Sequence, residues 1–433
     1  MPAVQGSSPR SRRSPAPGFK CADAASDTSD MVRSSHRSRT VRIAGIAAAL
    51  LFASTAPAAV EPPGVASIAT RTHPAVWRPE TTPRIAVADA GTARLDRTAV
   101  LVGGFTADLA ATAAVQVRNP RHGWEPVGCA LLTPRAGATV IALDEERLLV
   151  IGGWTGVLPG EVTRLGSVEI CEPAQPHRRR ATTPPFETTD GGLEGHAATI
   201  LPDGRVALLH QNRFSVFDPE AERWSPPATL DTTFLHPAVS AVGPDHLVLI
   251  GGRLEEGGTS VCSIHLSPHG IRQVHWRDTP VPALRDAASI TLEGERVLVV
   301  GGSIDGTSDP RTWILDAARR DVRPGPTLPI EGGIADAILH RSAFGILVVG
   351  GERRIEGRPS PPSGPAIVQL DRNSARRLPA PPARAIRTAI LANPTGIERF
   401  GGYRFEAATR DRGRASVLED ATSLRLVPVV VAD

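Results

Sequence analysis

A short apolar run that ends in two glycines recurs along the chain and limits the folds available to it. Six such pairs stand in register: Gly103-Gly104, Gly152-Gly153, Gly251-Gly252, Gly301-Gly302, Gly350-Gly351 and Gly401-Gly402. Their spacing is about 50 residues, except for one interval of 99 residues. In that interval RVALLHQ at 205–211 has the same apolar run, with His210 and Gln211 in place of the glycines. The sequence therefore contains seven copies of one unit.

Each unit reads as a set of short β-strands. In one unit, ATVIAL at 138–143 precedes a polar turn and the strand LLVIGG at 148–153, and SVEICEP at 167–173 supplies a third strand. Runs of four to six apolar residues separated by turn residues are typical of strands. The 41 glycines and 40 prolines supply many turns, and no long segment keeps a helical period. We therefore predict an all-β fold.

The repeat resembles the kelch repeat over roughly residues 80–420. The matching residues are the glycine pairs, Glu169, and a set of tryptophans, namely Trp124, Trp224 and Trp276. Cys171 departs from the pattern, because that family usually has Tyr there. The resemblance implies a β-propeller of about seven four-stranded blades, or six or eight if an end unit is shared or hidden. It assigns the glycine pairs and tryptophans structural roles where blades converge.

Two segments compete for the strand that completes the last blade. One is Val76-Trp77, ahead of the first unit, and the other runs from Ser423 to Val430. The sequence does not choose between them.

The first residues read as a targeting segment. A basic stretch from Arg33 to Arg42 precedes an apolar run at 43–53 that is too short to span a bilayer, and Ala56-Pro57-Ala58 suits cleavage. We predict a signal peptide at 31–58, translated from Met31, with 1–30 a non-native extension or disordered. Residues 59–79 are then a linker with a candidate closing strand, and 80–433 the propeller. The protein is expected to be exported, to the periplasm or the medium.

Three cysteines follow the predicted cleavage site: Cys129, Cys171 and Cys262. An odd number in an oxidising compartment permits at most one internal disulfide. The sequence does not say which two would pair, and a buried free thiol is the alternative for each.

Composition and motifs exclude several functions. The net charge is +3 with acidic and basic residues interspersed, so no basic stripe for nucleic acid is present. HExxH, CxxC and GxSxG motifs are missing, and we expect no metal and no cofactor. Copper radical oxidases of kelch-like architecture need two tyrosines, whereas Tyr403 is the single tyrosine here. A monomer is expected.

The candidate binding residues come from the resemblance. In kelch propellers the residue before each innermost strand commonly faces the central channel, and arginines occupy that position in three units. These are Arg135, Arg285 and Arg384, and His196, His236 and Arg387 stand nearby in their units. Together they would form a positive funnel suited to a carboxylate ligand or an acidic peptide. Alternatively, the side chains bond to carbonyl groups of the blades.

Two further segments stay open to more than one interpretation. His210-Gln211-Asn212-Arg213 is either a decayed blade or a ligand contact. The Arg- and Pro-rich loop at 352–364 either binds a partner or is solvated.

The sequence thus predicts an exported binding module for a protein or a carboxylate-bearing ligand, without assigned catalysis. The alternative is a sugar-acid mutarotase, because exported bacterial kelch proteins include sialic acid mutarotases. An arginine would then hold the carboxylate, and His196 or His236 would act as the base.

Overall fold

The structure is a computed structural model. It describes residues 71–72, 75–119, 121–175, 177–182, 186, 188, 192–252, 260–393, 396–405, 415–426 and 428–429. The chain divides into the units Met1–Ala66 and Ser67–Asp433, and all described residues belong to the second. The predicted signal peptide at 31–58, the segment 1–30 and most of the predicted linker lie outside the described residues. No helix in the described ranges could span a membrane.

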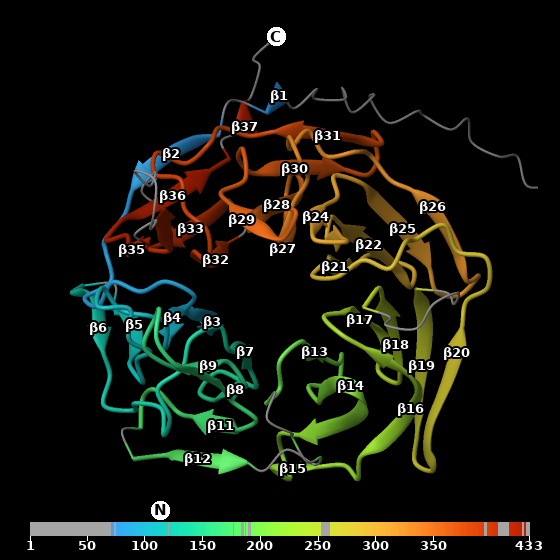
Figure 1. Ribbon diagram of the computed structural model, residues 1–433, viewed down its shortest axis with the longest axis horizontal. Helices are drawn as coiled ribbons and strands as arrows, with labels where there is room; N and C mark the ends of the chain where they lie inside the picture. The colour runs from blue at the N-terminus through green and yellow to red at the C-terminus, as the bar shows by residue number, and fades with distance from the viewer. Residues whose placement is uncertain are drawn as a thin grey trace, which may run out of the picture. The chain divides into compact units, whose positions relative to one another are not determined.

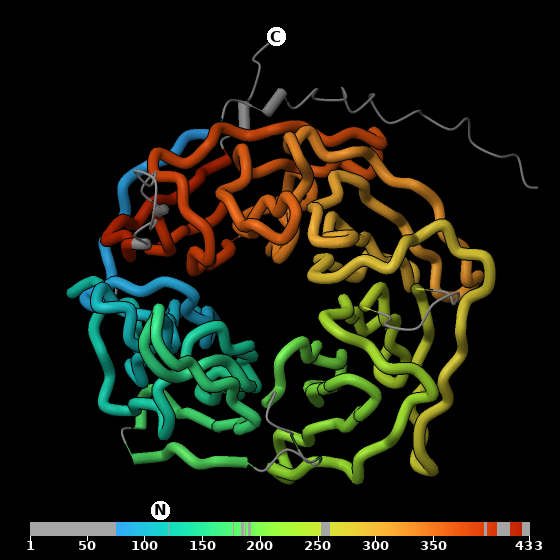
Figure 2. The backbone as a smooth tube through the Cα atoms, in the orientation of Figure 1, coloured from blue at the N-terminus to red at the C-terminus, as the bar shows by residue number. Residues whose placement is uncertain are grey.

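The described residues form a seven-bladed β-propeller of antiparallel sheets, which confirms the predicted fold class (Figure 1; Figure 2). From the inside outward, blade 1 is β3 (Gly91–Leu95), β4 (Thr98–Val102), β5 (Val115–Asn119) and β6 (Gly123–Pro126). Blade 2 is β7 (Thr139–Ala142), β8 (Leu148–Ile151), β11 (Val168–Cys171) and β12 (Arg179–Thr182). Blade 3 is β13 (Ala197–Ile200) and the long β14 (Val206–Asp218), and both β15 (Arg223–Trp224) and β16 (Ala228–Phe234) pair with β14.

The remaining blades follow the same order. Blade 4 is β17 (Ala238–Gly243), β18 (His246–Ile250), β19 (Val261–Ser267) and β20 (Gly270–His275). Blade 5 is β21 (Ala288–Thr291), β22 (Arg296–Val300), β25 (Thr312–Asp316) and β26 (Asp321–Pro324). Blade 6 is β27 (Ala335–Ser342), β28 (Gly345–Ile355), β30 (Ala366–Gln369) and β31 (Ser374–Arg377). Blade 7 is β32 (Ala389–Asn393), β33 (Gly396–Phe400), β36 (Ala421–Arg425) and β2 (Val76–Pro79).

Short strands outside the blades extend their connections. β9 (Trp154–Gly156) pairs with β10 (Val162–Arg164), β23 (Ser303–Ile304) with β24 (Thr307–Ser308), and β34 (Tyr403–Phe405) with β35 (Ala415–Val417). β29 (Arg358–Ser360) pairs with the end of β28, and β1 (Arg71–Thr72) pairs with β37 (Pro428–Val429).

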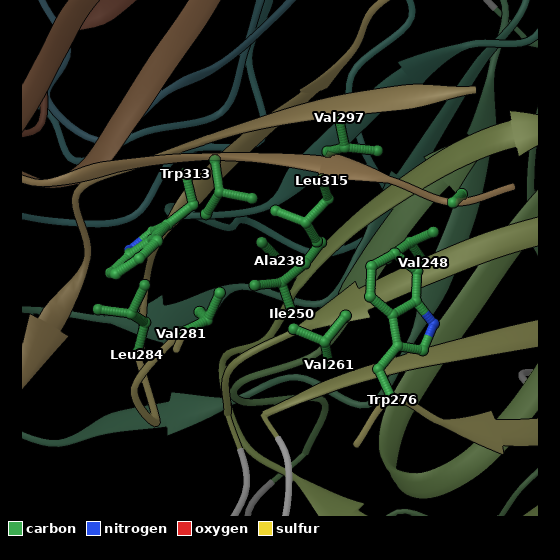
Figure 3. Close-up of a cluster of buried hydrophobic side chains, with 12 residues drawn as sticks. Ala238, Val248, Ile250, Val261, Trp276, Val281, Leu284, Val297, Trp313 and Leu315 are labelled. Carbon is green, nitrogen blue, oxygen red and sulfur yellow. The ribbon is translucent and has the colours of Figure 1, made fainter. Parts of the chain in front are cut away.

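The apolar runs are continuous because each blade is covered on both faces. Successive side chains of a strand point to opposite faces. Thus Val248 and Ile250 of β18 pack toward blade 5, whereas Leu247 and Leu249 pack toward blade 3. Figure 3 shows the interface of blades 4 and 5, where Ile250 meets residues such as Leu315. One such buried cluster fills each of the seven interfaces.

Tryptophans and glycine pairs lie where blades meet. Trp124 and Trp276 are buried between blades, and Trp224 packs against the cluster between blades 2 and 3. Gly301 has φ +62°, and a Cβ there would lie 2.2 Å from the carbonyl oxygen of Ile334 in the next blade. The amide of Gly302 donates to that same carbonyl at 2.8 Å. A side chain at this glycine would therefore separate the two blades.

Both candidate segments take part in closing the ring. β36 is the third strand of blade 7, and β2 pairs with it as the outermost strand, with Val76 opposite Arg425 and Pro79 opposite Thr422. The indole of Trp77 also donates to the carbonyl oxygen of Pro379 in blade 6 at 2.8 Å. The first described strands of the propeller therefore complete its last blade.

Candidate functional site

One residue from each blade surrounds the central channel at an equivalent position, close to the start of the innermost strand. All seven have left-handed backbone, with φ between 53° and 69°, and all line one cavity. We call them the hub positions: Asp89, Gly137, Gly195, His236, Asp286, Asp336 and Arg387. Asp and His are enriched in left-handed conformation, but Arg is unusual there, so the surrounding blades must hold the backbone of Arg387 in place.

Backbone hydrogen bonds join neighbouring hub positions. The amide of Asp286 donates to the carbonyl oxygen of His236 at 3.0 Å, and the amide of Asp336 to that of Asp286 at 2.9 Å. The amide of Asp89 donates to the carbonyl of Arg387 at 2.8 Å, across the junction of blades 1 and 7. Because these bonds use backbone atoms, the hub side chains are left free to define the chemistry of the channel.

The cavity has a volume of about 850 Å³. Besides the hub positions, it is lined by residues from the β9–β10 hairpin of blade 2, the β23–β24 connection of blade 5 and the end of β28 in blade 6. This volume is typical of sites for small organic ligands.

A network of charges fills one side of the cavity. Arg354, on the extension of β28, bonds to the hub residue Asp286, to Asp336 at 2.6 Å and to Glu352 at 2.5 Å. Arg387 lies 3.4 Å from Glu352, 3.6 Å from Asp336 and 3.8 Å from Asp89. Four carboxylates thus face two guanidinium groups. Although burial acts in the opposite direction, the carboxylates raise the pKa of both arginines.

Two groups in this network could exchange protons near neutral pH. Burial raises the pKa of Asp336 to about 6, and the negative charge of Asp286 adds to the effect. His236 Nδ1 lies 2.7 Å from Asp286, and this hydrogen bond raises the pKa of the imidazole. Burial acts to raise the pKa of Asp286, but its contacts with His236 and Arg354 lower it overall. Asp336 can therefore be protonated close to neutral pH, and His236 carries positive charge over a wider pH range than usual.

The opposite side, formed by blades 2 and 3, is less charged. Its hub positions are Gly137 and Gly195, which place no side chain in the channel. His196 contacts the carbonyl of Leu193 at 2.7 Å and the Thr139 hydroxyl at 2.9 Å through its two ring nitrogens. Burial lowers the pKa of His196 to about 4, so the ring is neutral at neutral pH.

Four of the six residues proposed from the sequence line this cavity: His196, His236, Arg285 and Arg387. Arg285 is exposed, and among the described residues its guanidinium has no hydrogen-bond or ion-pair partner.

The other two residues lie elsewhere. Arg135 is fully buried between blades 1 and 2, where it pairs with Glu169 and donates to the carbonyl oxygen of Gly152 at 2.8 Å. Arg135 therefore follows the alternative considered from the sequence, in which the side chain bonds to carbonyl groups of the blades. Arg384 is exposed and lines a separate cavity with Pro382 and Arg404.

The cavity is of mixed charge and not the positive funnel that was expected, because, among the residues that the structure describes, five carboxylates line it beside four arginines and two histidines. Sequence reasoning missed all five acidic residues, namely Asp89, Glu194, Asp286, Asp336 and Glu352. It missed the hub carboxylates because the channel-facing residue lies one to three positions after the arginines that were chosen. The recurring triplets ADA at 88–90 and 335–337 and RDA at 285–287 are the signal that could have revealed them.

Of the two segments left open, the 210–213 segment lies within β14. His210 is buried and stacks on Phe186 at 6.3 Å, and it does not line the central cavity. In the 352–364 segment, Glu352 and Arg354 belong to the charge network.

Tyr403 contributes a second unpaired polar group. It is 7% exposed and lines the cavity near Phe105, and among the described residues its hydroxyl has no hydrogen-bond partner. Burial raises the pKa of this phenol. A buried hydroxyl without a partner carries a free-energy cost that a bound polar molecule would remove. No group of three His, Cys, Asp or Glu residues in the described part of the chain is arranged to hold a metal ion.

Comparisons with known proteins support the architecture. The sequence matches no protein-family model and no curated protein. Among solved structures, a fungal alcohol oxidase of the AA5 family, solved in complex with copper, matches with 12% identity and a TM-score of 0.57. That match covers 83% of this chain and 76% of the oxidase. The structure of YjhT matches with 14% identity and a TM-score of 0.50, and covers 68% of this chain and 98% of YjhT. At these identities the similarity shows a common propeller fold and carries no function from those proteins to this one.

Proposed function

We propose that the central cavity binds a small polar molecule that carries a carboxylate. The observation that carries the proposal is Arg285, an exposed guanidinium on the cavity wall with no partner among the described residues. Arginine binds carboxylates through two parallel hydrogen bonds. Arg164, Arg354 and Arg387 also line the cavity but are already paired with carboxylates, so Arg285 is the guanidinium available to an anionic ligand.

Hydroxyl groups of the ligand have partners in the same cavity. The Tyr403 hydroxyl and the carboxylate oxygens of Asp89 and Asp336 line the cavity. The bare glycines of blades 2 and 3 leave room on the facing side. A hydroxylated acid, such as a sugar acid, would satisfy both the guanidinium and these oxygen atoms. An acidic peptide of a partner protein would use Arg285 alone, so it makes a weaker fit.

A specific observation also favours a second candidate, sugar-acid mutarotation. Opening a cyclic hemiacetal requires a base that takes the proton of the anomeric hydroxyl and an acid that protonates the ring oxygen. Closure on the other face reverses both transfers, so no atoms are gained or lost. Asp336, with its pKa raised to about 6, is suited to one transfer, and His236 to the other. Of the two histidines considered from the sequence, His236 is favoured because both nitrogens of His196 are engaged.

Calorimetric titration of the purified chain with uronic acids, sialic acid and an acidic peptide tests the binding proposal. The Arg285→Ala variant lacks a charge-assisted hydrogen bond to the ligand. It should therefore bind a sugar acid about 10- to 100-fold more weakly than the parent protein. Arg384→Ala is the matched control, because it removes an exposed arginine outside the cavity and should leave affinity unchanged. The proposal fails if no acid binds, or if both variants bind as the parent does.

Mutarotation is measured by the rate at which separated anomers of the bound acid interconvert in NMR spectra. A rate increase that Asp336→Asn or His236→Asn abolishes would support the second candidate. Binding without a change in rate would support a binding module without this activity.

We also propose that the protein acts outside the cytoplasm, because residues 31–58 read as a signal peptide. A mature protein that begins at residue 59 would support this.

A further inference from the structure

Two of the three cysteines that follow the predicted cleavage site lie together at the interface of blades 1 and 2. Cys129 follows β6 in blade 1, and Cys171 is the last residue of β11 in blade 2. The two sulfur atoms are 2.8 Å apart and both side chains are fully buried. Even the smaller carbon atoms pack no closer than about 3.5–4.0 Å when they are not bonded. Two thiols would have to move apart, whereas a disulfide would draw them together.

The position of this pair differs from that of the third cysteine. Cys262 lies in β19, within the cluster between blades 3 and 4, and no other cysteine is in contact with it among the described residues. The odd number of cysteines therefore resolves into one pair and one buried thiol. We propose that Cys129 and Cys171 form a disulfide that links blade 1 covalently to blade 2.

Formation of the bond requires a disulfide-containing oxidant, such as oxidised glutathione or an oxidised dithiol enzyme. The thiolate of one cysteine attacks the oxidant and forms a mixed disulfide, and the second thiolate then displaces the reduced oxidant. The two cysteines together lose two protons and two electrons, and the oxidant becomes two thiols.

The buried environment of the two cysteines determines at which stage of folding the disulfide can form. Burial, together with the neighbouring Cys129, raises the pKa of the Cys171 thiol, so Cys171 is almost never a thiolate in the folded protein. Exchange needs the thiolate and access for the oxidant. The bond therefore forms while blades 1 and 2 are still assembling, and it is protected from reductants afterwards. It closes a loop between positions 42 residues apart, which restricts the unfolded chain.

Peptide mapping tests the link directly on the full chain. The protein is refolded in a glutathione redox buffer, denatured with an alkylating reagent and digested with trypsin without reduction. Cys129, Cys171 and Cys262 fall on separate tryptic peptides, 122–135, 165–178 and 254–272, and Cys21 of the full chain falls on a fourth, 21–33. The expected product is 122–135 joined to 165–178, with Cys262 alkylated. Alkylation of all three cysteines, or a link that includes Cys262, overturns the proposal.

Two comparisons strengthen the test. Cys262→Ser should keep the linked peptide, whereas Cys129→Ser should leave Cys171 open to alkylation. Protein refolded with the oxidant should melt roughly 5 °C above protein refolded with a reductant, because the crosslink restricts the unfolded chain. Equal melting temperatures, with the linked peptide missing, would rule out the bond.

Discussion

Replacing Arg135 by alanine should destabilise the propeller without acting on the central cavity. The Arg135 side chain is 0% exposed, and its partner Glu169 is 2% exposed. The guanidinium donates to the Gly152 carbonyl at 2.8 Å, to the Ser167 hydroxyl at 3.0 Å and to Glu169. In Arg135→Ala the Glu169 carboxylate stays buried and keeps only two backbone donors, the amides of Leu132 and Thr133.

The size of the effect follows from the Glu169 carboxylate, which stays buried without its charged partner. Removing one partner of a buried ion pair costs about 3–5 kcal/mol. For a domain of roughly 360 residues this corresponds to a melting temperature lower by about 4–6 °C. Thermal unfolding followed by circular dichroism measures it, with Arg384→Ala as an exposed arginine control. Adding Glu169→Gln to Arg135→Ala removes the buried charge and should recover part of the loss.

Equal melting temperatures of Arg135→Ala and the parent protein would contradict this prediction. If the variant keeps its stability but loses affinity for a carboxylate ligand, Arg135 belongs to the binding face after all.

The other predictions concern the blade contacts and the hub. Gly301→Ala should cost at least about 2 kcal/mol, because its Cβ would lie 2.2 Å from the Ile334 carbonyl oxygen. Gly294→Ala has a similar positive φ but no atom within 4 Å, so it should cost only about 1 kcal/mol; equal losses on urea unfolding would contradict the close blade contact. Asp336 has a folded pKa raised to about 6, above its value in the unfolded chain, so its contribution to stability is present at low pH and is lost as the pH rises from about 4 through 6. The melting temperature of Asp336→Asn relative to the parent should therefore increase across that range, and a constant difference would show that Asp336 is not protonated in the folded state near pH 5.

The fold could be predicted because each repeat records the same physical environment. LVLIGG at 247–252 is apolar at every position since both faces of β18 are buried, and it ends in glycines where the next blade approaches. The sequence could not show which of two segments, Val76-Trp77 or Ser423–Val430, completes the last blade. Both segments are β-prone, and blade 7 uses both.

The site was harder to predict than the fold. Arg285 and Asp286 are adjacent in sequence, and Arg384 stands three positions before Arg387, yet only backbone geometry decides which of them faces the channel. The left-handed backbone at each hub position turns the chain and so decides which of the neighbouring side chains faces the channel. The spacing of the repeats carries no information about this turn. Glu352 and Arg354 reach the hub because β28 continues beyond its glycine pair, whereas in the other five units that have a glycine pair the strand ends before it.

Blade 7 sets the order in which a newly synthesised chain can mature. Val76–Pro79 are made early, but their partner Ala421–Arg425 is made almost at the end, so β2 waits unpaired while some 340 residues are added. Once Ala421–Arg425 has been made, the open edge of blade 7 can accept β2 of another copy in place of its own, since an open strand edge is a template for pairing. Crowded synthesis should therefore yield dimers that exchange this first strand, and dilute synthesis should yield separate molecules.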